Sequence, residues 1–255
     1  MTRRRRVALA CGLLVAHAQA ARAQANLQLW GNVTIDWTQS ARLTYALDFE
    51  PKVLLKAPEG DPAWRNLDLT PNVEYALKDW LDLIGEATVG YTKQSDDDNT
   101  FELTPRAGVR LHGFSRSVPV YGPHVRELPP KRRVVVRDRV LVESRNFFYL
   151  GTGSGSSSDL RLRNRLELLV PINRPNLTDD GARYWLVDWE VFMPVGDPDE
   201  RFANKQRVRA GLGFRPSVAW RFEAIYAWTR SRNTIEEGFQ SSDNIIDLRL
   251  KRVFQ

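Results

Sequence analysis

The amino-acid sequence predicts an all-β protein, a transmembrane antiparallel β-barrel with closed up-and-down topology and about twelve strands. Ten strands is the alternative. Three observations predict this class. Apolar residues recur at every second position over most of the chain. The alternating segments are about 11 to 13 residues long, enough for a tilted membrane strand, which needs about 9–11. The chain contains no run of 18 or more apolar residues, so no membrane-spanning helix is predicted.

The N-terminal segment, residues 1–25, is predicted to be a cleavable signal peptide. A positive stretch, Arg3–Arg6, precedes a short apolar stretch, Val7–Ala16, and two small-x-small cleavage sequences overlap in Ala21–Ala25. An ordinary N-terminal helix is the alternative. Cys11 lacks the aliphatic residue three positions earlier that a lipoprotein signal requires, so cleavage by signal peptidase near the end of the segment is expected.

The predicted barrel domain, residues 26–255, is nearly neutral. The whole chain holds 37 Lys and Arg against 31 Asp and Glu, and five of the arginines lie in the signal peptide, which leaves 32 against 31. The basic balance is therefore a targeting feature and predicts no nucleic-acid partner. The domain also holds no cysteine, so disulfides cannot stabilise it.

Five segments in the first half keep their apolar residues at odd numbers: 27–37, 43–55, 67–77, 81–91 and 101–111. Their 31 odd positions carry no charged residue, whereas a chain with 27% charged residues would place about eight there. Successive side chains of a strand point to opposite faces of the sheet. The odd face is therefore predicted to contact lipid and the even face to line the lumen.

The second half repeats the alternation less regularly, in six further segments: 134–148, 160–170, 184–193, 205–214, 219–229 and 244–254. Eleven segments result, whereas bacterial single-chain barrels normally have an even number of strands. We therefore predict twelve, with one more strand near Ser115–Pro129. Ten would follow if an end segment lies outside the barrel.

A soluble sandwich or a lipocalin-like barrel would show the same alternation with its apolar face turned inward. Uniform strand length and aromatic residues near strand ends favour the membrane barrel, because aromatic girdles lie at both membrane interfaces. Short segments at 78–80 and 216–218 predict periplasmic turns. Longer polar segments at 92–99, 151–159 and 231–243 predict outer loops.

Several stretches resemble a proteobacterial outer-membrane family catalogued as a domain of unknown function. They are Leu29–Asn32, Phe49–Lys52, Gly90–Lys93, Arg201–Arg209 and Ser242–Asp247. The resemblance runs from about Leu27 to Phe254 and implies a membrane barrel, located in the bacterial outer membrane. The family carries no catalytic or binding residues to transfer.

The last strand is similar to the C-terminal signal that the barrel-assembly machinery recognises, because Ile246, Leu248 and Leu250 alternate toward Phe254. Arg252 interrupts this apolar face. The machinery is the partner expected during biogenesis, and outer-membrane lipid and lipopolysaccharide are the partners expected in the membrane.

Charged residues predicted to line the lumen are the strongest functional feature of the sequence. They are Asp48, Glu50, Glu74, Glu86, Glu102, Arg106, Arg110, Arg137, Arg139, Arg161, Arg163, Arg165, Arg207 and Arg209. Acids dominate the first four strands and bases the later ones. One interpretation is a salt-bridged interior that fills and stiffens a small barrel. The other is a narrow pore with a transverse field. Arg163 and Arg207 are expected to reach across to acids such as Glu74 and Glu86.

Two other functions remain open. A lipid-modifying enzyme would centre on His112, with Ser115 or Ser117 as nucleophile and Glu102 or Glu143 orienting the base. A surface-interaction barrel would contact lipopolysaccharide through loop residues, namely His124, Arg126, Lys131, Arg132 and Arg133.

No catalytic residue, cofactor or metal site is predicted. The glycine-rich stretch Gly151–Gly155 lacks the Gly-Lys-Ser/Thr of a phosphate loop. The acidic stretch Asp96–Asn99 matches no calcium-loop spacing, and no Cys/His cluster predicts zinc or iron.

Overall fold

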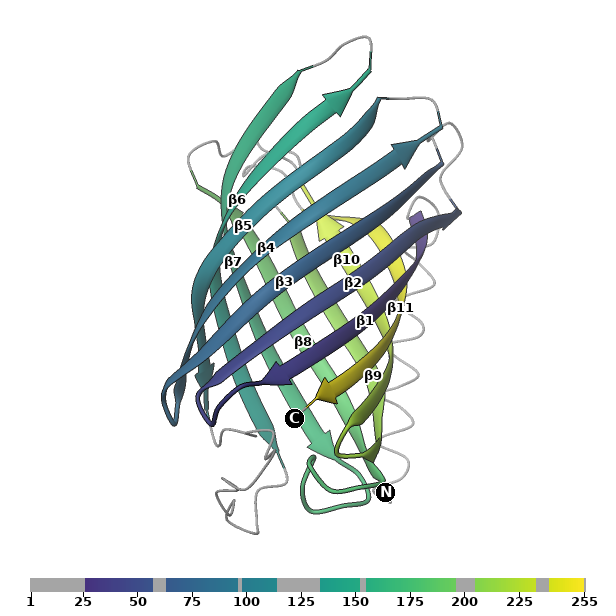
Figure 1. Ribbon diagram of the computed structural model, residues 1–255. Helices are drawn as coiled ribbons and strands as arrows, with labels where there is room; N and C mark the ends of the chain where they lie inside the picture. The colour runs from purple at the N-terminus through teal and green to yellow at the C-terminus, as the bar shows by residue number, and fades with distance from the viewer. Residues whose placement is uncertain are drawn as a thin grey trace.

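The computed structural model describes residues 26–56, 63–95, 98–113, 134–151, 155–195, 205–232 and 239–254. In these residues eleven strands close into one barrel (Figure 1). The strands are β1 (Asn26–Thr38), β2 (Leu43–Lys56), β3 (Trp64–Lys78), β4 (Leu81–Gln94), β5 (Asn99–His112), β6 (Val135–Leu150), β7 (Ser156–Pro171), β8 (Ala182–Pro194), β9 (Lys205–Ser217), β10 (Trp220–Ser231) and β11 (Gln240–Phe254). The predicted signal peptide, residues 1–25, lies outside the described residues.

Neighbouring strands pair antiparallel in sequence order, except at the seam, where β1 and β11 run parallel. Asn26 lies opposite Asp243 and Trp37 lies opposite Phe254. The parallel seam follows from the odd strand number, because in an up-and-down barrel every odd-numbered strand runs in the same direction. The prediction of twelve strands, and the alternative of ten, is therefore wrong for the residues that the structure describes. The proposed extra strand near Ser115–Pro129 lies outside them.

Even strand numbers are a regularity of known bacterial barrels and are not a requirement of hydrogen bonding. The parallel seam pairs twelve residues of β1 with twelve of β11, so the edges of both strands are satisfied. Within the described residues, no helix is long and apolar enough to cross a membrane.

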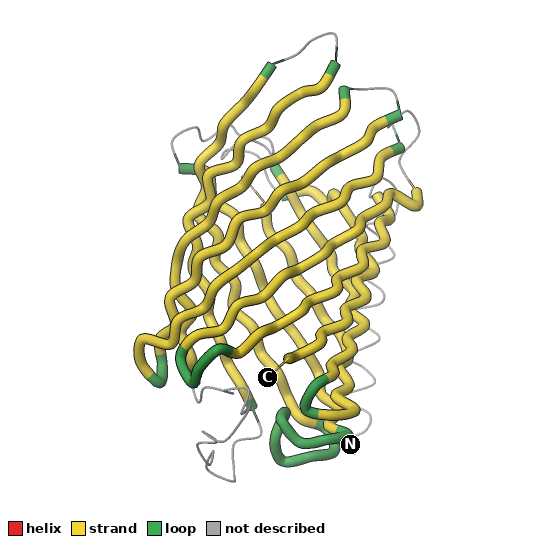
Figure 2. The backbone as a smooth tube through the Cα atoms, in the orientation of Figure 1, coloured by secondary structure: helices red, strands yellow, loops and turns green. Residues whose placement is uncertain are grey.

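The two ends of the barrel differ (Figure 2). At one end, here called the turn end, β1–β2, β3–β4 and β9–β10 are joined by short turns, residues 39–42, 79–80 and 218–219. The opposite end, the loop end, holds the β2–β3, β4–β5, β6–β7, β8–β9 and β10–β11 connections. The two short turns predicted from the sequence therefore lie at the same end of the barrel.

The β7–β8 connection at the turn end is longer and is held by its own hydrogen bonds. Asn176 and Asp179 bond to each other through backbone and side chain, and Asn173 donates to the carbonyl of Gly181 at 2.9 Å. Gly181 has φ +75°, a conformation that glycine adopts without strain. The connection is thus a defined structure, and its Leu177 reaches the cavity described below.

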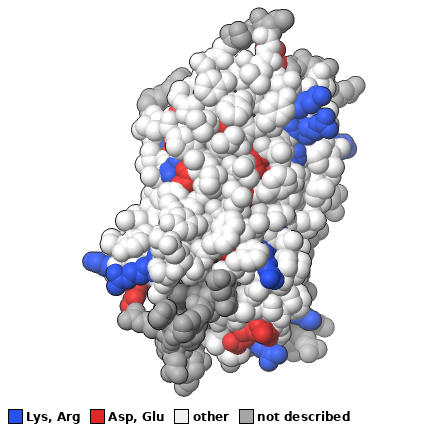
Figure 3. Space-filling view, in the orientation of Figure 1, with Lys and Arg blue, Asp and Glu red and all other residues white. Residues whose placement is uncertain are grey.

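The outward face is apolar, as the alternation predicts. Val33, Phe49, Leu69, Val89 and Leu103 lie directly opposite one another on five successive strands. Their side chains are 38–42% exposed. The space-filling view shows a largely uncharged surface, with the larger charged groups, mostly basic, toward the two ends and only small charged spots between them (Figure 3).

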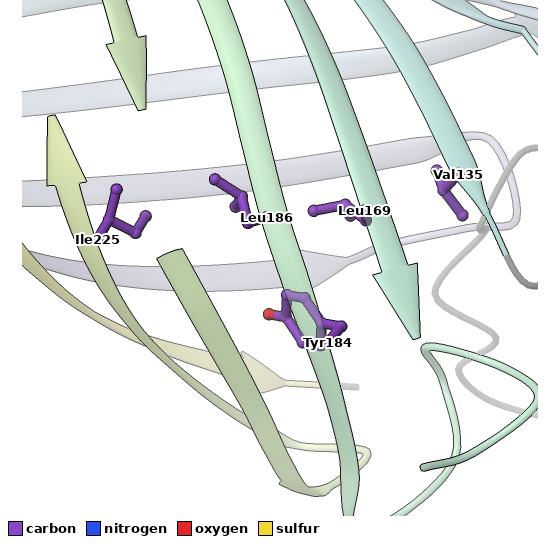
Figure 4. Packing of buried hydrophobic residues seen from close by; sticks show 5 residues of the cluster. All are labelled: Val135, Leu169, Tyr184, Leu186 and Ile225. Carbon is purple, nitrogen blue, oxygen red and sulfur yellow. The ribbon is translucent and has the colours of Figure 1, made fainter. Parts of the chain in front are cut away.

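A small apolar cluster lies inside the barrel near the turn end (Figure 4). It consists of Val135, Leu169, Tyr184, Leu186 and Ile225, with Leu177 of the β7–β8 connection packed against it. All five cluster residues are buried. This cluster anchors the β7–β8 connection over the turn end.

Tyr184, a member of this cluster, also forms a hydrogen bond through its hydroxyl group. Its ring covers Gly213, its direct partner on β9, so closely that any side chain there would overlap it. The Tyr184 hydroxyl donates to Glu223 at 2.6 Å. The glycine therefore makes room for the ring, and the ring carries its hydroxyl to a buried carboxylate.

Candidate functional site

The inside of the barrel encloses a cavity of about 1170 Å³. Its lining includes Asn26, Trp64 and Gln94 near the loop end, and Thr38 and Val218 near the turn end. The residues predicted to line the lumen all lie along this cavity: Asp48, Glu50, Glu74, Glu86, Glu102, Arg106, Arg110, Arg137, Arg139, Arg161, Arg163, Arg165, Arg207 and Arg209. Their inward orientation follows from the two-residue period of the strands.

The cavity wall contributed by β1–β4, here called the acidic wall, carries seven acids and two lysines. The acids are Asp36, Asp48, Glu50, Asp68, Glu74, Asp82 and Glu86, and the lysines are Lys52 and Lys78. Asparagine and threonine side chains stand between them. Asp48 accepts hydrogen bonds from Thr34 and, at 3.1 Å, from Asn72. Neutral groups thus satisfy part of the negative charge of this wall.

Lysines neutralise three further carboxylates of the acidic wall. Lys52 on β2 pairs with Asp68 and lies 3.1 Å from Glu50. Lys251, which extends from β11, lies 2.5 Å from Asp36. The Lys52 pair with Asp68 links β2 to β3 within the acidic wall, and the Lys251 pair with Asp36 links β11 to β1 at the seam.

The opposite wall, contributed by β5–β9 and here called the arginine wall, carries twelve cations that line the cavity. They are Arg106, Arg110, Arg137, Arg139, Arg145, Arg161, Arg163, Arg165, Lys205, Arg207, Arg209 and Arg215. The lining acids of the same strands are Glu102 and Glu167. Three more acids of this wall, Glu143, Asp188 and Glu190, are 0–1% exposed beneath the guanidinium groups. The cavity therefore meets a cationic surface here.

Glu143 is the first of the buried anchors. Arg106 Nε lies 2.8 Å from its carboxylate, and Arg163 Nη1 donates to it at 3.2 Å. Arg161 donates through Nε. A carboxylate with three guanidinium groups beside it, two of them hydrogen-bond donors, and no access to water is a strongly coupled unit.

Glu190 is the second anchor and shares Arg163 with the first. It accepts hydrogen bonds from Arg163 Nε at 2.6 Å, from Arg209 Nη2 at 3.0 Å and from Arg207 Nη1 at 3.3 Å. Asp188 extends this network of ion pairs. It accepts hydrogen bonds from Arg209 Nε at 2.7 Å and from Arg165 at 2.9 Å. The network thus runs without a break from β5 to β9.

The acids expected to pair across the lumen, Glu74 and Glu86, instead pair with arginines one or two strands away. Glu74 binds both Nη groups of Arg110, two strands away. Glu86 lies 3.2 Å from Arg106 and 3.6 Å from Arg139. The expectation that Arg163 and Arg207 form ion pairs with these acids is therefore wrong for the described residues. Both arginines lie within bonding distance of buried carboxylates on their own wall, and these nearer anchors hold them there.

A cation–π contact also joins the arginine wall to the acidic wall, on the side of β10 and β11. The guanidinium of Arg207 lies 4.9 Å from the ring centre of Trp30, and Lys52 Nζ lies 4.8 Å from the same ring. Trp30 is on β1, whereas Arg207 is on β9. Because both residues line the cavity, this cation–π contact narrows it between the two walls.

His112 has a carboxylate partner, although not one of those expected. Its Nε2 lies 2.7 Å from Asp82, and both side chains are 4% exposed. Glu102 is engaged by Arg145 and Thr104, and Glu143 by three arginines, so neither of them orients His112. The candidate nucleophiles Ser115 and Ser117 lie outside the described residues.

The sequence interpretation overlooked Asp188 and Glu190, the acids that hold the arginine wall together. They alternate with Trp185, Val187 and Trp189, which face outward. That alternation would have placed both acids in the lumen, so a signal existed in the segment 184–193.

Other candidate sites fall largely outside the described residues. These are the loop cations His124, Arg126, Lys131, Arg132 and Arg133, together with Asp96, Asp97 and residues 152–154. In the part of the chain that the structure describes, no group of three His, Cys, Asp or Glu residues could hold a metal ion.

Residues 27–239 match the family described as Protein of unknown function (DUF2490). The chain belongs to this family. The match covers the barrel from β1 up to the segment before β11, including every strand of both walls. No curated protein and no solved structure matches the chain.

Proposed function

We propose that this member of the family spans the outer membrane of a Gram-negative bacterium and conducts small polar solutes through a narrow, charge-lined passage. The observation that carries the proposal is the inverted polarity of the barrel. Apolar side chains cover the outside, and the charged ones lie inside around a cavity.

The outside of the barrel supports insertion into lipid. Every strand of the described barrel carries at least one large hydrophobic side chain that is more than a third exposed. Soluble monomers rarely expose contiguous apolar patches above a few hundred Å². A closed barrel also satisfies its backbone hydrogen bonds internally, as the hydrocarbon core requires.

The inside supports a narrow passage. Eight-stranded barrels are filled by side chains, and open channels appear at about 16–18 strands, so eleven strands give an intermediate lumen. The cavity has lining residues near both ends of the barrel and separates a cationic from an anionic wall. A solute with dipolar or charged groups would pass between opposite charges.

A pair of substitutions in the middle of β3 tests the proposal. Leu69 faces outward and is 41% exposed, whereas Asn72 lines the cavity 3.1 Å from Asp48. Leu69→Arg should disfavour insertion into phospholipid vesicles by about 2–4 kcal/mol, the cost of arginine near the bilayer midplane. Asn72→Arg should cost much less, because its charge meets an acid in water.

Conductance in planar bilayers is the second measurement on the same proteins. The native chain should form a pore of low conductance, and Asn72→Arg should retain it. Equal insertion by the two variants would contradict the outward orientation, and a native chain that inserts without conducting would refute the pore.

A further inference from the structure

The outer surface carries two cations side by side at the loop end of β3 and β4. Arg65 and Lys93 lie directly opposite each other in the strand register, and both are exposed. Side chains directly opposite in an antiparallel pair share one face, with their Cβ atoms about 4.5–5.5 Å apart. The next pair on that face, Leu67 and Tyr91, is 43% and 42% exposed, so the two cations also point outward.

Within the part of the chain that the structure describes, no group compensates this arrangement. Like charges directly opposite destabilise a strand pair. Among the described residues, neither Arg65 nor Lys93 forms an ion pair, a side-chain hydrogen bond or a ring contact. The arrangement therefore favours an anion from outside the chain.

Outward cations at the turn end are different. Arg252 lies over the rings of Trp220 and Phe254, at 4.5 and 5.2 Å, and Arg183 lies 5.8 Å from the ring centre of Phe214. Those guanidinium groups have partners within the aromatic girdle. Among the described residues, Arg65 and Lys93 have no such partner. An external anion would therefore supply the partner that the protein does not provide there.

Its position selects the kind of anion. Toward the middle of the strands the same face continues with Leu67 and Tyr91 and then with Leu69 and Val89, all apolar or aromatic. The pair thus stands at the edge of the apolar belt, at the depth of lipid headgroups in a membrane-spanning barrel.

We propose that Arg65 and Lys93 bind the phosphate group of a lipid headgroup in the leaflet at the loop end. This rests on the proposed membrane-spanning function. A guanidinium offers two parallel N–H donors to phosphate oxygens, and an ammonium adds a compact charge beside it. One phosphomonoester would neutralise both cations, while its acyl chains would lie along the apolar rows below.

The test uses the full-length processed chain in phosphatidylcholine vesicles that contain increasing fractions of phosphatidic acid, a lipid with a headgroup phosphomonoester. Bound phosphatidic acid is counted by native mass spectrometry. The loop-end variant is Arg65→Gln with Lys93→Gln. The matched control is Arg183→Gln with Arg252→Gln, which removes two outward cations at the turn end.

The loop-end variant should need about thirtyfold more phosphatidic acid for half-saturation, because each cation near an anionic surface contributes a factor of about five. The control variant should bind like the native chain. Equal loss in both variants, or no loss in the loop-end variant, overturns the site. Full competition by millimolar inorganic phosphate would assign the site to a soluble anion and overturn the lipid.

Flotation with pure phosphatidylcholine vesicles separates the two proposals. If the native chain does not float, membrane insertion fails and the lipid site fails with it. If native and loop-end variant float equally and bind phosphatidic acid equally, only the site is refuted.

Discussion

The two walls of the lumen satisfy buried charge in different ways. On the acidic wall, Asp48 accepts hydrogen bonds from neutral Thr34 and Asn72, and the cavity lies directly beside it. On the arginine wall, Glu143 and Glu190 are fully buried and each meets three guanidinium groups. An acid beside the cavity whose hydrogen-bond partners are neutral can lose its charge at little cost. A buried acid that anchors three cations cannot.

The two walls also differ in the role that they play in the barrel. The arginine wall is a continuous network from β5 to β9, so it fixes the shape of the cavity on that side. The acidic wall has isolated contacts within itself, such as Lys52 with Asp68, and its Glu74 and Glu86 pair with arginines of the other wall. We infer that the stability of the barrel depends more on the arginine wall, whereas the ion preference of the passage depends on the charge difference between the two.

The largest expected effect follows from Glu190. Glu190→Ala leaves Arg163, Arg207 and Arg209 beside an empty buried site, and removing one partner of a buried ion pair costs about 3–5 kcal/mol. Asp48→Asn on the acidic wall keeps its size and its neighbours and should lower the free energy of unfolding by less than about 1 kcal/mol. Urea unfolding of both variants in vesicles measures the difference, and equal losses would mean that the walls are energetically alike.

A smaller loss of stability, with a change in conductance, is expected for Arg163→Ala combined with Arg207→Ala. Glu190 keeps Arg209, and Glu143 keeps Arg106 and Arg161, so the free energy of unfolding should fall by about 1–3 kcal/mol. Because two long side chains leave the lumen, single-channel conductance should rise above the native value. A native conductance already as high as that of the double variant would show that the arginine wall does not restrict the passage.

The sequence predicted which residues face the lumen far better than which of them pair. Alternation fixes the face of every residue within a strand, so the apolar outside follows from the two-residue period of each strand. Pairing depends on register and on the reach of the side chains. Arg110 meets Glu74 although β4 lies between their strands, and no local pattern encodes that contact.

The prediction of twelve strands was wrong for a related reason. The eleven segments were all visible in the sequence, and the twelfth was added because known barrels have even numbers. The parallel pairing of Trp37 with Phe254 and of Asn26 with Asp243 joins residues from the two ends of the barrel domain. A contact between such distant segments leaves no trace in the alternation of either strand.

The smallest expected effect concerns the cation–π contact of Trp30 with Arg207. Trp30→Ala removes the ring beside Arg207 and Lys52, but Arg207 keeps Glu190 and Lys52 keeps Asp68. A cation–π contact contributes about 0.5–1 kcal/mol at a hydrated site, so stability should change little. Conductance should rise, though less than in the Arg163 and Arg207 double variant, because both cations stay in the lumen. Trp30→Phe retains an aromatic face and should conduct like the native chain. If Trp30→Ala alone conducts as well as the double variant, the narrowest point lies at the Trp30 ring, and the acidic side of the lumen restricts the passage.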